Sequence, residues 1–230
     1  MKKILILGTM FLVALVANAQ LMETEELEKY AKEKFGDNWE QAAMNISKEI
    51  QLDKNNGLTY TRVIEAPGKT KNELYVMVNY WYTQTFNSAN TQVAGKSQIQ
   101  LNDREAGAII SRGWMSKVAS HKGGLNQYQV NLAPVIKTDI RDGKVRVTYT
   151  VPYLDVQKIQ GGGLLGSAAN RKYVEEKWTF DQCYPFVEKD AHMRTSSKAF
   201  VMAHAYSNVI LDKIEEAVKG GLVGNESDDW

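Results

Sequence analysis

The stretch that decides the fold is 128–151, which reads YQVNLAPVIKTDIRDGKVRVTYTV. Asp142-Gly143 is typical of a two-residue hairpin turn, where both positions favour positive φ. The turn predicts a register in which Ile140 faces Val145 and Ile136 faces Tyr149. One face of the hairpin then collects the apolar side chains of Tyr128, Val130, Leu132, Ile136, Ile140, Val145, Val147, Tyr149 and Val151. Such a division is typical of an antiparallel sheet covered on one side.

The polar face of this hairpin supplies the candidate binding residues. Alternation places Lys137, Arg146, Thr148 and Thr150 on it, as exposed hydrogen-bond donors for a partner. Asp139 stands opposite Arg146 as an opposite-charge pair, so it could simply hold that side chain in place. A merely solvated face is the alternative reading of the same pattern.

Period-two alternation and turn residues predict further strands around the hairpin. They cover 58–65, 98–101, 106–118 and 173–180, with a loop at 121–126. Two stretches have helical spacing instead. The first opens with a capping box at Thr70 and Glu73 and carries an apolar stripe of Leu74, Met77, Val78, Trp81, Tyr82 and Phe86. The second runs over 197–219 with a stripe of Ala199, Ala203, Tyr206, Ile210, Ile214 and Val218. We expect both stripes to pack on the apolar side of one sheet.

The N-terminus predicts export. A basic start, an apolar run of about thirteen residues and Ala17-Asn18-Ala19 are typical of a cleaved signal peptide, and a membrane-spanning helix would need about twenty. The expected organisation is a signal peptide over 1–19, a helical segment over 20–56, an α+β domain over 57–221 and a flexible tail over 222–230. In the helical segment, Thr24 is expected to cap the first helix, and the second helix is expected over 39–50. The mature protein is then periplasmic or extracellular, without a stable membrane anchor.

Composition narrows the class of partner. Without Lys2 and Lys3, 26 basic residues face 27 acidic ones, a net charge of about −1. A general nucleic-acid binder would need a basic face, so we expect no nucleic-acid partner. Cys183 is the single cysteine in the sequence, which excludes an internal disulfide. Its aromatic neighbours predict that it is buried, and a link between two copies of the chain is the alternative.

Two segments resemble a known family. The first is Val63–Tyr75 (VIEAPGKTKNELY), followed by Trp81 and Phe86, and the second is Asp103–Ile110 (DREAGAII). In this order they are similar to a family of exported bacterial proteins, mostly from Bacteroidota, known as a domain of unknown function with a TBP-like fold. The resemblance spans roughly Leu58 to Asp155. It implies an antiparallel sheet with helices on one face, in the order strand, helix, strands, helix. It implies no activity, because the family has none established.

For each possible catalytic or metal-binding motif, a structural interpretation is favoured. Gly161–Gly166 lacks the Lys-Ser/Thr of a phosphate loop and reads as a mobile hairpin loop. The histidines, His121, His192 and His204, lie apart in the sequence and lack zinc-ligand spacing. Glu175 and Glu176, adjacent on a strand, point to opposite faces and cannot form one acid–base pair. Trp81, Trp114 and Trp178 fall on predicted inner faces, where core packing is favoured over a ligand pocket. We therefore predict no catalytic residue, metal or cofactor.

Two classes of function stay open. The absence of a catalytic motif favours an exported, non-catalytic binding module of the cell envelope, acting on a protein or a glycan. The alternative is a periplasmic hydrolase with an unrecognised active site. A deep cleft with converging polar groups would favour the enzyme, and a broad uncovered sheet face would favour the module. The ligand and the oligomeric state do not follow from the residues.

Overall fold

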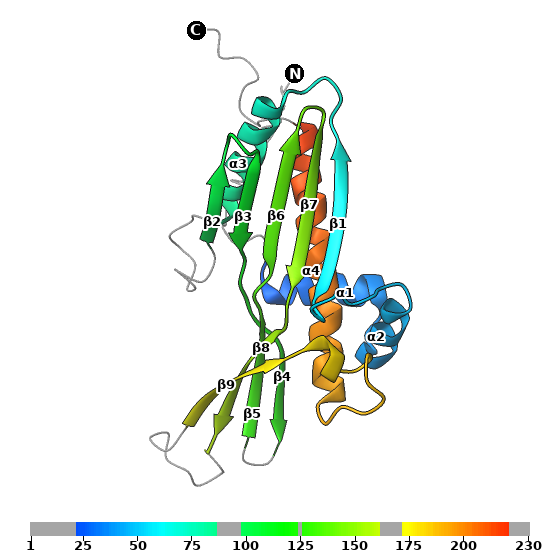
Figure 1. Ribbon diagram of the computed structural model, residues 1–230. Coiled ribbons are helices and arrows are strands. Elements are labelled where there is room, and N and C mark those ends of the chain that lie inside the picture. Colours follow the sequence, from blue (N-terminus) through cyan, green and yellow to red (C-terminus); the bar gives the residue numbers. More distant parts are fainter. Residues whose placement is uncertain (1–21, 87–97, 124–125, 162–171, 221–230) are drawn as a thin grey trace, which may run out of the picture.

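Two antiparallel sheets and a long helix that spans both of them form the frame of the computed structural model (Figure 1). The structure describes residues 22–86, 98–123, 126–161 and 172–220. The expected leader, the tail and residues 162–166 of the glycine-rich loop lie outside this described part of the chain. The architecture is mixed α+β, as the sequence predicts, but the strands divide between two sheets instead of forming one.

The first sheet has five strands, in the spatial order β1-β7-β6-β3-β2. They are β1 (Leu58–Glu65), β7 (Lys144–Val151), β6 (Val135–Arg141), β3 (Ala108–Arg112) and β2 (Gln98–Asp103). The register predicted from the turn is confirmed, since Ile140 lies opposite Val145 and Ile136 opposite Tyr149. In the turn itself only Gly143 has positive φ, at 72°, so the expectation of a positive φ at both positions is wrong for Asp142.

The second sheet was not foreseen. Its strands, in spatial order, are β4 (Met115–Gly123), β5 (Asn126–Leu132), β8 (Leu154–Gln160) and β9 (Lys172–Trp178). The stretches 106–118 and 128–140, each expected to be one strand, both break and pass from one sheet to the other. The breaks lie side by side, where the Gly113 amide donates to the Pro134 carbonyl at 2.8 Å. Pro134 itself has no amide hydrogen to continue a ladder. The predicted loop at 121–126 is also wrong, because β4 continues to Gly123 and β5 begins at Asn126.

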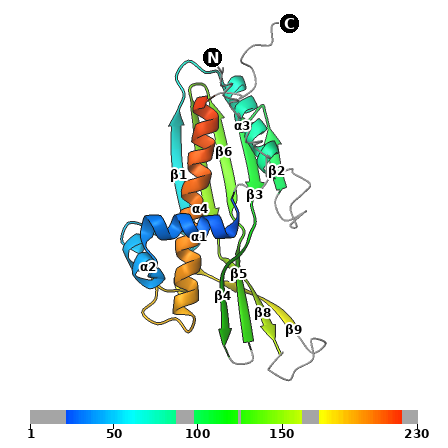
Figure 2. The same ribbon diagram turned by 180° about the vertical axis from the view of Figure 1, so that it is seen from behind.

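Helices α3 (Lys71–Phe86) and α4 (Met193–Gly220) cover one side of the five-stranded sheet, called here its inner face (Figure 2). The predicted capping box is confirmed, since the Thr70 amide donates to Glu73 at 2.7 Å and the Glu73 amide donates to the Thr70 hydroxyl at 3.3 Å. Asp142 of the hairpin turn accepts a further hydrogen bond from the Lys71 amide at 2.7 Å. The turn that sets the sheet register therefore also anchors the start of α3.

The N-terminal helices α1 (Thr24–Phe35) and α2 (Trp39–Ser47) pack on α4. Glu23, not Thr24, precedes α1 as its cap residue, because the Thr24 hydroxyl donates to the Ser116 carbonyl of β4 instead. The second helix ends at Ser47, three residues before the expected Ile50. The apolar stripes of α3 and α4 both face inwards, as predicted. Ile210 of α4 is fully buried, whereas Trp81 of α3 is only half-buried. Among the described helices none is long and apolar enough to cross a membrane.

Candidate functional site

The outer face of the five-stranded sheet, opposite α3 and α4, is a polar surface that no described helix covers. Figure 1 shows the sheet in front of both helices, and Figure 2 shows the helices from the other side. Alternation fixes which side chains stand on it, because their strand neighbours Val145, Val147 and Tyr149 are fully buried on the inner face. The hairpin register therefore determines which side chains lie on the outer face.

The structure places the candidate residues Lys137, Arg146, Thr148 and Thr150 on this outer face. Lys137 lies directly opposite Thr148, and the side chains of Lys137 and Arg146 are 46% and 54% exposed. Thr148 and Thr150 are half-buried between neighbouring strands. The positions agree with the register argument, while any role in binding stays a prediction.

Asp139 links the two cations of this set. Its carboxylate accepts from Arg146 Nη2 at 2.8 Å and lies 3.0 Å from Lys137 Nζ. Burial acts to raise the pKa of Asp139, but the hydrogen bonds from Arg146 and Lys137 outweigh it and hold the pKa below its usual value. Asp139 is thus ionised at neutral pH and orients Arg146 across the sheet.

Thr150 has a structural partner. Its hydroxyl lies 3.0 Å from the Thr59 hydroxyl, which donates to Asp53 at 2.7 Å. Asp53 also accepts from the Gly57 amide at 2.9 Å, closing the loop that leads into β1. This chain of hydrogen bonds ties the loop to the sheet, so Thr150 is the least available of the four residues.

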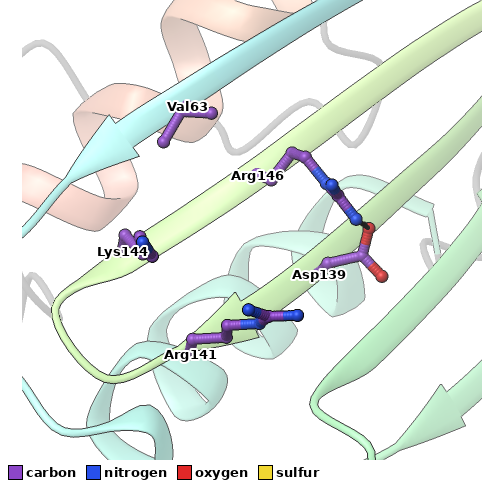
Figure 3. Close-up of a pocket in the computed structure, with 5 residues that line it drawn as sticks. All are labelled: Val63, Asp139, Arg141, Lys144 and Arg146. Carbon is purple, nitrogen blue, oxygen red and sulfur yellow. Dashed lines mark hydrogen bonds and ion pairs between the residues drawn. The ribbon is translucent and has the colours of Figure 1, made fainter.

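A hollow of about 180 Å³ opens on the outer face near the hairpin turn. Figure 3 shows the five residues that line it: Val63 of β1, Asp139 and Arg141 of β6, and Lys144 and Arg146 of β7. Three of them are cationic and one is apolar, with Val63 52% exposed. Arg141 and Lys144 form no ion pair with any residue in the described ranges. The hollow therefore has two cations available to an anion.

Sequence reasoning named only Arg146 among these five as a binding residue. Arg141 and Lys144 flank the turn and share the strand parity of Asp139 and Arg146, so the same alternation could have found them. Val63 could not have been found this way, because its place depends on the pairing of β1 with β7, which brings it opposite Arg146.

The histidines prove less isolated than their spacing suggests. The rings of His121 and His192 lie 5.9 Å apart, and His192 stacks on Trp178 at 4.8 Å and contacts Tyr128 at 4.5 Å. His204 is elsewhere, with its Nδ1 atom 2.9 Å from the Tyr60 hydroxyl. In the part of the chain that the structure describes, no three His, Cys, Asp or Glu side chains come together as a metal site would require.

Cys183 is buried, as predicted. Burial raises the pKa of its thiol to about 12, and the charges of Asp190 and Asp181 act in the same direction. A nucleophilic cysteine needs its thiolate form, so Cys183 is unsuited to covalent catalysis at neutral pH.

Comparison with known proteins supports the fold. Residues 60–153 match the family model described as a domain of unknown function (DUF4468) with TBP-like fold. A TBP-like protein from Parabacteroides distasonis is similar in structure, with a TM-score of 0.51 and 12% identity over 73% of this chain and 96% of that one. A DUF4468 family protein from Bacteroides ovatus has a TM-score of 0.44 and 14% identity over 72% and 88%. Among curated proteins no match is found.

Proposed function

We propose that this chain, whose residues 60–153 match the DUF4468 family with its TBP-like fold, works as an exported, non-catalytic binding module of the cell envelope. The partner is an envelope protein or a glycan. It binds on the outer face of the five-stranded sheet, around Lys137, Arg146 and Thr148. Thr150 lies at the margin of this surface, since its hydroxyl is shared with Thr59.

One observation carries this proposal: the described helices pack on one face of the five-stranded sheet, and the other face holds a cationic hollow. Covering one face is sufficient to build the core, because the buried side chains of β1, β6 and β7 all point towards α3 and α4. No described helix covers the polar outer face, which we propose serves recognition. A broad face of this kind suits a macromolecular partner, whereas enzymes that act on small molecules mostly use an enclosed pocket.

Export is the part of the proposal that depends on the leader. We expect signal peptidase to cleave after Ala19, so that the mature protein begins at Gln20 in the periplasm or outside the cell. Mass spectrometry of the native protein from fractionated cells measures this terminus directly. Recovery of an intact Met1 terminus in the membrane fraction would contradict export by cleavage.

The binding surface is tested by the double variant Arg146→Ala/Thr148→Ala. We expect the free energy of unfolding to fall by about 1 kcal/mol or less, because Arg146 forms a surface ion pair, which contributes little, and Thr148 is a half-buried strand residue whose change to alanine costs at most about the span of strand propensities. Asp139 keeps Lys137 as a partner, so the variant leaves no carboxylate stranded. The same variant is expected to retain much less of any partner captured from envelope extract by the mature wild-type protein.

A matched control keeps the residue types and changes the surface. Arg194→Ala/Thr83→Ala removes an exposed arginine and an exposed threonine from α4 and α3, away from the outer face. It is expected to capture the partner as the wild type does. Full retention of the partner by Arg146→Ala/Thr148→Ala would remove the outer face as the binding surface.

A further inference from the structure

We propose that the hollow lined by Val63, Asp139, Arg141, Lys144 and Arg146 binds an acidic sugar, a hexuronate unit of a glycan. The inference depends on the proposed function, because it names the class of partner that the outer face recognises. It follows from the charges, the size and the apolar side chain that lines the hollow.

The charged residues around the hollow favour an anionic ligand. Three cations surround the hollow, and its one carboxylate, Asp139, is already engaged by Arg146 and by the neighbouring Lys137. Glu65, opposite Lys144 in the β1–β7 register, makes no ion pair with it in the described structure. Arg141 can donate two parallel N–H hydrogen bonds to a carboxylate, and Lys144 can donate a third to the same group.

The presence of Asp139 selects among anions. Because its pKa is lowered, it is ionised inside the hollow at neutral pH and would repel a dianionic phosphate more strongly than a monoanionic carboxylate. Its Oδ2 atom accepts two hydrogen bonds from Arg146, whereas its Oδ1 atom has Lys137 as its one donor among the described residues and keeps a lone pair that can accept a hydroxyl proton. A ligand with one carboxylate and several hydroxyl groups satisfies both the cations and Asp139.

The size of the hollow and its apolar lining residue fit a sugar ring. A volume of about 180 Å³ has room for one ring, and the exposed methyl groups of Val63 offer an apolar contact for its C–H face. Thr61 and Thr148 form the next cross-strand pair along β1 and β7, with hydroxyl groups on the same outer face. A glycan could therefore continue from the hollow along these two strands.

Isothermal titration calorimetry of the mature protein tests the inference with four kinds of ligand. They are trimers of galacturonate, glucuronate and mannuronate, the same trimers with methyl-esterified carboxylates, a glutamate-rich peptide, and inorganic phosphate. We expect at least one uronate trimer to bind, at least tenfold more tightly than its esterified form, with affinity falling as salt is added. Esterification removes the charge and leaves the ring and hydroxyl groups, so it isolates the role of the carboxylate.

Variants locate the binding in the hollow. Arg141→Gln and Lys144→Gln are each expected to weaken uronate binding at least tenfold, since each removes a cation that has no ion-pair partner among the described residues. Arg112→Gln is the matched control, because Arg112 lies on the same outer face of β3 but outside the hollow. It is expected to change the affinity less than twofold.

Several outcomes would overturn the inference: no binding of any uronate trimer, equal binding of the esters, tighter binding of the peptide or of phosphate, or equal losses in Arg112→Gln. Failure of the proposed function looks different, because it appears as full partner capture by Arg146→Ala/Thr148→Ala. If the uronates fail while that double variant still loses its envelope partner, the binding face stands and only the sugar assignment falls.

Discussion

Replacing Ile210 with alanine is expected to lower the free energy of unfolding by about 2–5 kcal/mol. Ile210 is fully buried in α4, the 28-residue helix that packs on both sheets and on α1 and α2. Truncation removes apolar contacts within the buried cluster and leaves a cavity, because close-packed surroundings collapse only in part. Chemical denaturation at neutral pH measures the loss.

A graded comparison separates cavity formation from general damage. Ile210→Val removes one methylene and is expected to cost about 0.5–1.5 kcal/mol. Trp81→Ala in α3 is expected to cost less than Ile210→Ala, because Trp81 is half-buried and contacts Tyr82 and Phe86 at its edge. Unchanged denaturation midpoints for both alanine variants would contradict the packing of the two helices on one side of the sheet.

The local parts of the fold follow from local signals. Asp142-Gly143 gives the β6–β7 register, and Thr70 with Glu73 gives the start of α3, because each depends on residues only a few positions apart. The division into two sheets has no such signal. Alternation continues through Gly113-Trp114 and through Ala133-Pro134, so the period alone cannot reveal that both stretches change sheets.

In the candidate site, too, local sequence patterns predict some features, and non-local contacts determine the others. Strand parity places Lys137, Arg146 and their neighbours on the outer face, and it equally covers Arg141 and Lys144. The hollow also needs Val63, which reaches Arg146 through a pairing between strands about eighty residues apart in the chain. The contact between His121 and His192 is non-local too, since one side chain comes from β4 and the other from the segment before α4. Tertiary placement of this kind has no counterpart in residue spacing.

Stability is expected to fall by about 2 kcal/mol between pH 7 and pH 5 through His204 alone. Burial lowers the pKa of this imidazole to about 4, and the Lys34 charge acts in the same direction. The Tyr60 hydroxyl lies 2.9 Å from its Nδ1 atom, and the Phe35 ring lies 5.1 Å away. Among the described residues, no carboxylate acts on this imidazole to stabilise its proton. An unfolded histidine titrates near pH 6.5, so the unfolded state binds the proton first as the pH falls.

The resulting stability is therefore complete above about pH 6.5 and is lost as the pH falls towards 4. His204→Gln removes the titrating group and keeps a polar side chain near Tyr60, so its unfolding free energy should vary about 2 kcal/mol less than that of the wild type over the same interval. Lys34→Gln is a milder test, because loss of that charge raises the pKa of His204 and should shrink the pH effect. Urea denaturation at pH 7, 6 and 5 measures the unfolding free energy of all three proteins. The interval ends at pH 5 because the pKa values of Glu28 and Asp53 are lowered, so both carboxylates stay ionised over it. An identical pH dependence in the wild type and His204→Gln would show that His204 is not held neutral by the fold.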